Sequence, residues 1–580
     1  MKKILFLVLG CSLLLTPSCK DFLQKNDPTN PTENTFWQSK NDFDMALTAI
    51  YARIRGGSYY SQTAYPSENL LSTFLAFFDN FSDNAVSNSV TMDGSEAVLQ
   101  DVINPSNMPG MTGNAYGYAY ACIERINIFL GKLDEFYSDK SNADYKQFKG
   151  EALALRGIMY HYLYVCYGEV PVVKEALTIE TMYKEKASRE DVYKAVVADF
   201  TDAMACLTPG EAYSARPGRI THDAVIAFRA RTKLYHAYDA SGKAVPAEMA
   251  EILTELNQIK AAYSMAPDIL TNFHTGAQAN SPEIMFSLRF LKPSYRNQID
   301  LFVGDWKTIC PTRDLVYAFP MADGVTKYTP DPAVEAAMYP DMEAQGKEMD
   351  ALREQLKKQG LKDEEIEKKV AEELKKRAEA LYDVYEKIFE NRDPRLVKSI
   401  AHNNVYDFSA YIKSGADSVA NGESSLTYFN VFKLVTPIAN KESWNNGYTW
   451  EGDQDVVLMR WGHVLLMKAE AAFESGNTAD AIKYINELRT PRGIVAITDL
   501  DQEALRNEIR IETCFEGLRY FDMKRWRILD KMNGKIHDPS MPSSFKVVVN
   551  PAHFDWPLPQ SEILKARENG VDLKQNPGYL

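Results

Sequence analysis

The chain lacks the short motifs by which hydrolases, nucleotide-binding enzymes and zinc proteins are usually recognised. Its 580 residues contain no HExxH, GxSxG, P-loop or dinucleotide-binding pattern. It has eight histidines, and none are paired at the spacing of zinc ligands. The 79 acidic residues leave open a glycosidase pair separated in sequence, but no pattern marks one. We therefore expect a protein without catalytic activity, metal or cofactor.

Basic charge and paired cysteines are also scarce. The chain has 65 Lys and Arg residues against 79 Asp and Glu, a net charge of −14. This balance argues against nucleic-acid binding, because phosphate contacts need clustered cations. Beyond residue 19 the cysteines are few, odd in number and without a CxxC pair, at positions 122, 166, 206, 310 and 514. Buried free thiols are the preferred interpretation, and one disulfide in an oxidising compartment is the alternative.

An apolar run at the N-terminus is too short to cross a membrane. Residues 4–15 follow two lysines, which is the layout of a secretory signal peptide. Small and turn-forming residues then lead to Cys19, an arrangement that resembles a bacterial lipobox, in which the cysteine is lipidated. Cys11 is the competing cysteine, but its apolar run has only seven residues. We predict a signal peptide over 1–18 and a lipidated tether over 19–40.

The stretch with the strongest pattern lies near the C-terminus. Residues 507–526 read NEIRIETCFEGLRYFDMKRW, with an apolar helical stripe in the first half. Gly517 stands where a helix would end, since glycine readily takes the left-handed conformation. Tyr520, Phe521 and Trp526 then alternate with charged residues. Such a mixture predicts rings buried against a neighbouring helix, with the charges paired at the rim.

Four segments resemble one known family. Residues 506–526 look like the signature of the RagB/SusD family of outer-membrane nutrient-binding lipoproteins, and residues 456–494 and 556–579 resemble the segments that flank it there. The run GEALALRGIMYHYLYVCYGEVPVV at 150–173 is similar to the family's first helical half. The resemblance implies non-catalytic capture of a glycan or a peptide at the cell surface. It also implies delivery to a TonB-dependent, SusC-like outer-membrane transporter, over which the protein would sit as a lid.

Helical periodicity covers most of the chain from residue 41 on. The predicted helices begin near residue 41 and span 116–133, 150–167, 189–207, 221–238 and 246–263, with more from 455 to 526. Residues 267–341 change to short strands and turns, such as EIMFSLRF. About half of the residues in 341–392 are charged, with apolar residues at helical spacing, which predicts an inserted helical hairpin of unassigned role.

These patterns predict one mostly α domain over 41–580. The resemblance implies that its helical pairs form a tetratricopeptide-like solenoid, while irregular loops and short strands carry the binding surface. A sugar-binding surface needs exposed rings beside polar side chains, because sugars offer C–H faces and hydroxyl groups. The candidates come from loops that carry such residues. These loops either lie in regions that the resemblance favours or are rich in Trp. They are Asp83, Asn84, Asn114, Tyr295, Asp305, Trp306, Trp444 and Trp450.

Trp306 and a further, acidic loop each have two interpretations. Trp306 follows Gly304 and Asp305 in a loop, which favours a stacking ring, but a core ring beside Leu301 and Phe302 is the safer interpretation. A second loop carries Glu451, Asp453 and Asp455, whose oxygens would suit Ca²⁺, although their spacing matches no known calcium loop. For these acids, solvation or capping of a following helix is the preferred interpretation.

The sequence thus predicts binding and delivery of a polysaccharide or oligosaccharide, with a lipid anchor in the outer membrane and a SusC-like transporter as partner. One alternative is a peptide-binding lid on the same kind of transporter. The other, from a different class, is a secreted glycoside hydrolase.

Replacement of the candidate lipidated cysteine tests the predicted anchor. Cys19→Ala should release the protein from membranes or leave it unprocessed, because several acyl chains hold a protein on a membrane far better than one. Palmitate labelling, with the wild type as reference, measures the outcome. Undiminished labelling of the variant would identify Cys11 as the acceptor and reject Cys19.

Overall fold

A computed structural model gives the structure of most of the chain. The described residues are 36–56, 71, 75–88, 93–291, 294–338, 342–402, 425–427, 429–435, 452–541 and 546–579. Cys19, Trp444, Trp450 and Glu451 lie outside them, so the predictions for these residues stay predictions. Across the described residues the chain is mostly helical, and no helix combines the length and apolar character needed to span a bilayer.

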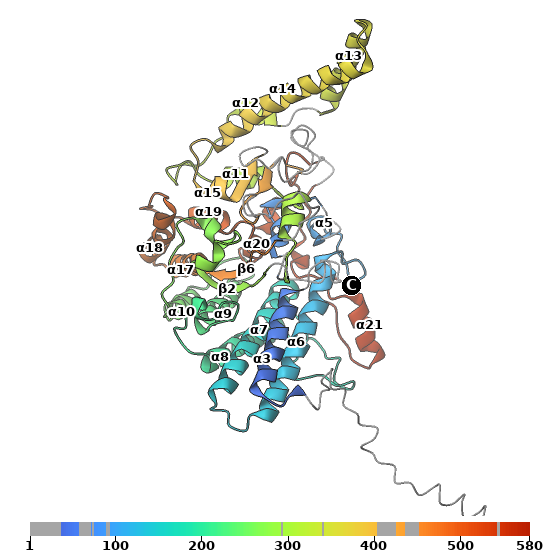
Figure 1. Cartoon of the computed structure of the whole chain (residues 1–580). Helices are drawn as coiled ribbons and strands as arrows, with labels where there is room; N and C mark the ends of the chain where they lie inside the picture. The colour runs from blue at the N-terminus through green and yellow to red at the C-terminus, as the bar shows by residue number, and fades with distance from the viewer. Residues whose placement is uncertain are drawn as a thin grey trace, which may run out of the picture.

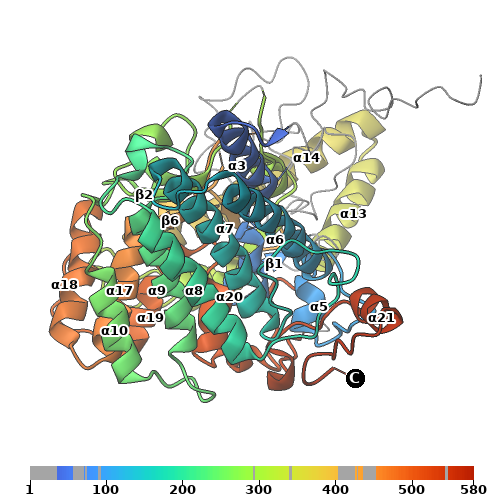
Figure 2. The same cartoon turned by 90° about the horizontal axis from the view of Figure 1, so that it is seen from below.

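A row of helices forms the scaffold. Each helix packs on the one listed before it, and Figure 2 looks onto the row. Its members are α3 (Lys40–Arg55), α6 (Met111–Phe136), α7 (Ala143–Tyr167), α8 (Arg189–Cys206), α9 (His222–His236), α10 (Pro246–Leu256), α17 (Trp461–Glu474) and α18 (Thr478–Arg489). Stacked helical pairs of this kind make a tetratricopeptide-like solenoid, so the predicted fold class is confirmed.

Capping side chains and a terminal glycine mark where several of these helices begin and end. Ser188 and Thr221 cap α8 and α9 by accepting hydrogen bonds from backbone amides of the first turn. Gly168 ends α7 with φ +73°, a conformation that glycine adopts without strain. The predicted helices are all present, although α6 and α7 begin earlier than predicted and α10 ends at Leu256 rather than Tyr263.

Short antiparallel strand pairs tie the middle of the chain to the solenoid. They are β1 (Ala85–Ser87) with β3 (Ile309–Pro311), β2 (Ile284–Leu288) with β6 (Val456–Arg460), and β4 (Ile400–His402) with β5 (Phe429–Val431). The prediction of helix from residue 455 was wrong at this point. Residues 456–460 are fully buried and form a strand, because they pair with β2 before α17 begins.

Outside the row and the charged insertion, the described helices of five or more residues are η3 (Leu75–Phe81), α5 (Ser95–Leu99), η7 (Asp300–Asp305), α11 (Arg313–Ala318), α12 (Pro332–Met338), α15 (Arg395–Ser399), α19 (Gln502–Thr513), α20 (Arg519–Arg525) and α21 (Gln560–Glu568). The five described cysteines are free thiols, and all but the half-buried Cys206 are buried, as preferred from the sequence.

The charged insertion is a helical hairpin, as predicted, and it projects from the body in Figure 1. It consists of α13 (Met342–Lys358) and α14 (Asp363–Phe389), and its outer part has an apolar cluster of its own. Arg392 fixes its base by donating to the carbonyls of Ile388 in α14 and Val316 in α11, at 2.6 and 2.7 Å. The outer part is thus held by its own contacts and the base by the main body.

The segments that carry the family resemblance meet inside the protein. The Trp556 amide donates to the Cys166 carbonyl at the end of α7, at 2.8 Å. Its indole Nε1 donates to the hydroxyl of Tyr520 in α20, at 3.1 Å. Tyr520, Phe521 and Trp526 are all buried, as predicted, but the charges between them are paired inside the protein rather than at a rim. These segments therefore build the scaffold.

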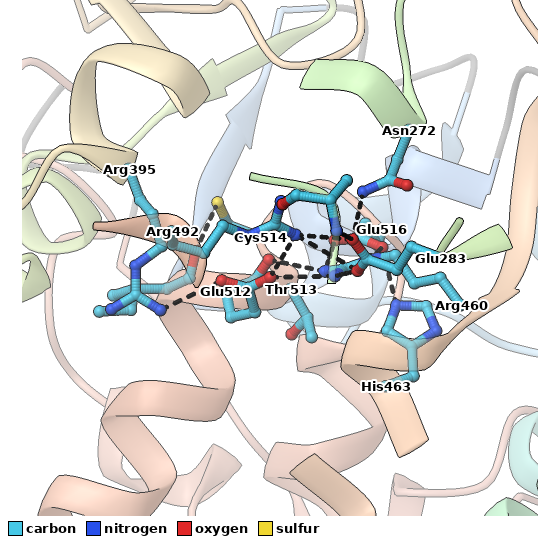
Figure 3. A network of polar contacts seen from close by, with 12 residues as sticks. Asn272, Glu283, Arg395, Arg460, His463, Arg492, Glu512, Thr513, Cys514 and Glu516 are labelled. Atoms are coloured by element: carbon cyan, nitrogen blue, oxygen red, sulfur yellow. Dashed lines mark hydrogen bonds and ion pairs between the residues drawn. The ribbon is translucent and has the colours of Figure 1, made fainter. Parts of the chain in front are cut away.

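Arg460, the last residue of β6, is the centre of a buried network of charges (Figure 3). Its Nε and Nη2 donate to the carboxylate of Glu516 at 2.8 and 2.6 Å. Its Nη1 donates to the carboxylates of Glu283 and Glu512 at 2.6 and 2.9 Å, and Nη2 donates to the Glu512 carbonyl at 3.0 Å. All five N–H groups of the guanidinium are therefore used, which is what a buried cation requires.

Further cations neutralise the same carboxylates. Arg395 and Arg492 pair with Glu512 at 3.1 and 3.3 Å, and Lys433 pairs with Glu516 at 2.6 Å. Burial by itself would raise the pKa of Glu512, but Arg492, Arg460 and Arg395 outweigh it and lower that pKa to about 2. Glu512 is therefore ionised in the folded protein at neutral pH.

Neutralising Glu512 should destabilise the fold in a pH-dependent way. At pH 7, Glu512→Gln should lower the free energy of unfolding by roughly 3–5 kcal/mol, since it removes one negative charge from a buried network that holds Arg395, Arg460 and Arg492. The folded-state pKa lies below the unfolded value of about 4.3, so the contribution is present above pH 5 and is lost as the pH falls towards about 2. Urea unfolding at several pH values measures both effects.

The control is Glu503→Gln, which removes an exposed carboxylate paired with Lys327 at 2.6 Å. Its unfolding midpoint should match the wild type. Equal midpoints for the two variants would contradict a structural role for the network.

Candidate functional site

The inner side of the solenoid is filled by the chain's own C-terminal helices. The first helices of the last three pairs, α7, α9 and α17, face α19 and α20 across a cavity of about 60 Å³. Its lining includes His161, Arg231 and Glu470 from the solenoid and Asp522 from α20. Solenoids often bind ligands on their inner side, but this space admits only a few water molecules. A ligand larger than a few water molecules does not fit in this cavity.

The turn between α19 and α20 is fixed by Asp79 of η3. The amides of Phe515 and Gly517 both donate to the Asp79 carboxylate at 3.1 Å, and both residues have positive φ, +64° and +72°. A Cβ on Gly517 would lie 2.3 Å from the Leu75 carbonyl oxygen, so only glycine fits. Burial raises the pKa of Asp79 to about 6.

Two predicted ligand contacts belong to this scaffold. Asp83 receives two hydrogen bonds from the guanidinium of Arg519, both at 2.7 Å. Burial raises the pKa of Asp83, but Arg510 and Arg519 outweigh it and hold that pKa well below its usual range. Asn84 is fully buried, donates to Asp79 at 2.7 Å and accepts from Arg510 at 2.8 Å. We therefore assign both residues to holding η3 and β1 against α19 and α20.

Trp306 lies at the opposite end of the β1–β3 pair, directly after η7. Its ring packs edge to face on Phe302, with centroids 5.2 Å apart and planes at 89°, and 43% of the side-chain surface is exposed. The side-chain amide of Asn88 donates to the Trp306 carbonyl at 3.3 Å. The ring is thus supported by Phe302 of the core and partly open to solvent, an arrangement intermediate between the two predicted ones. Nothing is described of the Asp305 side chain.

Tyr295 and Asn114 are also exposed, at different places. Tyr295 is 54% exposed, and the guanidinium carbon of Arg55 lies 4.2 Å from its ring centroid. Asn114 lies exposed in the first turn of α6. The structure therefore leaves Trp306, Tyr295 and Asn114 open to solvent but does not gather them with Asp83 and Asn84. Arg55 was missed from the sequence, because an arginine in the last turn of a helix is ordinary.

The segment that carries Tyr295 and Trp306 is fixed to the residues that precede β6. The backbones of Asn297 and Gly452 exchange two hydrogen bonds, at 2.9 and 3.0 Å. On the other side of residues 436–451, Val435 packs on Gly304. The described residues that flank the segment of Trp444 and Trp450 thus both contact the Tyr295–Trp306 segment.

The acidic loop has a different role from the one preferred earlier. Asp455 is buried, pairs with Arg289 at 2.8 Å and accepts from the Phe290 amide at 3.0 Å. Asp453 accepts from the Thr275 hydroxyl at 3.0 Å. The expectation of solvated or helix-capping acids was wrong for Asp455, because a strand follows it and an arginine neutralises it. No cluster of three or more His, Cys, Asp or Glu suited to a metal occurs among the described residues.

Two family models match the chain. One, described as the SusD family, matches residues 293–579, and the other, described as starch-binding and associating with the outer membrane, matches residues 21–234. The chain belongs to the SusD-like family.

Full-length relatives agree with this assignment. SusD-like protein P38 of Formosa agariphila is 22% identical over 563 residues, which cover 92% of this chain and 94% of that protein. Among solved structures, a SusD-like carbohydrate-binding protein from Bacteroides fragilis has a TM-score of 0.70 at 20% identity, covering 93% of this chain and all of the other. A laminarin-binding SusD-like protein has a TM-score of 0.61 at 18% identity, covering 93% and 99%.

Proposed function

We propose that this protein binds a polysaccharide or oligosaccharide at the surface of the outer membrane without altering it chemically. The observation that carries the proposal is the exposed ring of Trp306, held by Phe302 at the end of η7. A ring already fixed in place loses little side-chain freedom when a sugar stacks on it. Membership of the SusD-like family supports the proposal, as do similar structures named as carbohydrate-binding and laminarin-binding.

A peptide ligand is less well supported. The inner side of the solenoid, where helical repeats commonly hold peptides, is occupied by α19 and α20. No arrangement in the described part of the chain favours hydrolysis.

We also propose the cellular setting that the family resemblance implies. Cys19 carries the lipid, residues 1–18 are removed, residues 19–40 form the tether, and residues 41–580 make one domain with the 341–392 hairpin inserted. A TonB-dependent, SusC-like transporter receives the glycan. A family model described as associating with the outer membrane supports this setting.

Truncation of Trp306 tests the binding surface. Trp306→Ala should weaken binding by roughly 1–2 kcal/mol, by analogy with rings that stack on flat ligands. Because the ring is 43% exposed, the stability cost should stay below the roughly 3–5 kcal/mol of a core aromatic truncation. Affinity electrophoresis against laminarin and a panel of other polysaccharides measures binding, and thermal unfolding measures stability.

Phe136→Ala is the matched control. Phe136 is 41% exposed and packs on Phe43 with centroids 5.0 Å apart, so it resembles Trp306 in exposure and support. It lies on α6, and its truncation should leave binding unchanged. A destabilised Trp306→Ala variant with unchanged affinity would remove Trp306 from the site.

The proposed partner can be tested by purification. A stable complex with a transporter needs a large interface, on the order of 2,000 Å² or more. Extraction in mild detergents followed by affinity purification should therefore recover one much larger membrane protein. If several such detergents yield the lipoprotein alone, the protein binds glycans without a transporter.

A further inference from the structure

Arg55, the last residue of α3, has a positive charge that no described carboxylate neutralises. Its guanidinium lies over the Tyr295 ring at 4.2 Å and near the Phe290 ring at 5.7 Å, measured from Cζ to the centroids. Its Nη1 donates to the Arg289 carbonyl at 3.2 Å. It takes part in no other hydrogen bond and in no ion pair with the described residues. No described residue engages the remaining N–H groups of its guanidinium.

The neighbouring Arg289 differs from Arg55 because it already has a carboxylate partner. Arg289 pairs with the buried Asp455 at 2.8 Å, so its charge is already compensated. The same carboxylate accepts from the Phe290 amide at 3.0 Å and so fixes the backbone next to the Arg55 side chain. Arg55 is thus held in place by a carbonyl and two rings, and no described carboxylate pairs with its charge.

The turn beyond Phe290 presents an exposed surface beside this cation. The backbones of Leu291 and Tyr295 exchange hydrogen bonds at 2.7 and 2.8 Å, which closes the turn. Leu291 is 66% exposed and Tyr295 54% exposed. The ring against which the half-buried Arg55 guanidinium packs therefore lies in the same turn as the exposed Leu291 side chain.

We propose that Arg55, Tyr295 and Leu291 form a subsite for an acidic sugar. The guanidinium pairs with a carboxylate or sulfate of the sugar through two parallel N–H···O hydrogen bonds, a geometry that lysine cannot reproduce. The Tyr295 ring and Leu291 contact the C–H face of the same sugar. The side chains are already positioned, so binding costs little conformational entropy. This proposal rests on the proposed function and narrows the ligand to an acidic glycan.

Titration of the mature protein with three oligosaccharides tests the subsite. The probes are oligogalacturonate, which carries carboxylates, a sulfated carrageenan oligosaccharide, and neutral laminarin oligosaccharides. We expect the wild type to bind an acidic probe, and the probe that binds identifies the anion. Arg55→Gln should weaken that binding by about tenfold or more, because a hydrogen-bonded charge pair is lost. Arg55→Lys should show an intermediate loss and should fold normally, since it keeps the charge.

Arg53→Gln is the matched control. Arg53 lies in the same helical turn, and its guanidinium stacks at 5.3 Å on the ring of Tyr118, which is buried. Its loss removes the same charge without touching the exposed turn, so the affinity should stay within about twofold of the wild type, as for most surface substitutions.

Three results would overturn the proposal. Acidic sugars that bind wild type and both Arg55 variants equally would show that Arg55 is not a ligand contact. Binding of neutral laminarin oligosaccharides alone would reject the acidic ligand while leaving the proposed glycan-binding function intact. Failure of all glycans to bind, from this set and from a wider panel, would reject both.

Discussion

The guanidinium of Arg460 joins segments that lie far apart in the chain. Its carboxylate partners stand at position 283, just before β2, at position 512 in the last turn of α19, and at position 516, between α19 and α20. These groups have no contact with water, so each must find its partner inside the protein or bear a large desolvation cost. The network therefore ties the strand before the last solenoid pair to the irregular middle of the chain and to the C-terminal helices.

This constraint explains why the segment with the strongest family resemblance says little about the ligand. In residues 506–526 the acids, the arginines and the rings are used to fill and neutralise the interior. The proposed binding surface instead uses Trp306, at the end of η7, and Leu291 and Tyr295, which follow the segment fixed by Asp455. The scaffold and the binding surface thus use different residues, and one can change without the other.

The sequence predicted the helices well and the site only in part. Amphipathic periodicity and caps such as Ser188 are local signals, so the helical pairs and the charged hairpin could be foreseen. The pairing of Asp83 with Arg519 links residues 436 positions apart, and no local pattern reports it. The exposure of Trp306 and the uncompensated charge of Arg55 depend on what packs beside them, which sequence alone does not give.

The α13–α14 hairpin projects from the body and is joined to it at its base. Its outer half is stiffened by its own small core, and its root is fixed by Arg392 and by Tyr385, whose ring packs on Phe429 of β5 at 5.4 Å. Strand β5 in turn contacts η7, which ends next to Trp306. Contacts therefore run without a break from the root of the hairpin through β5 to η7, the element that precedes Trp306.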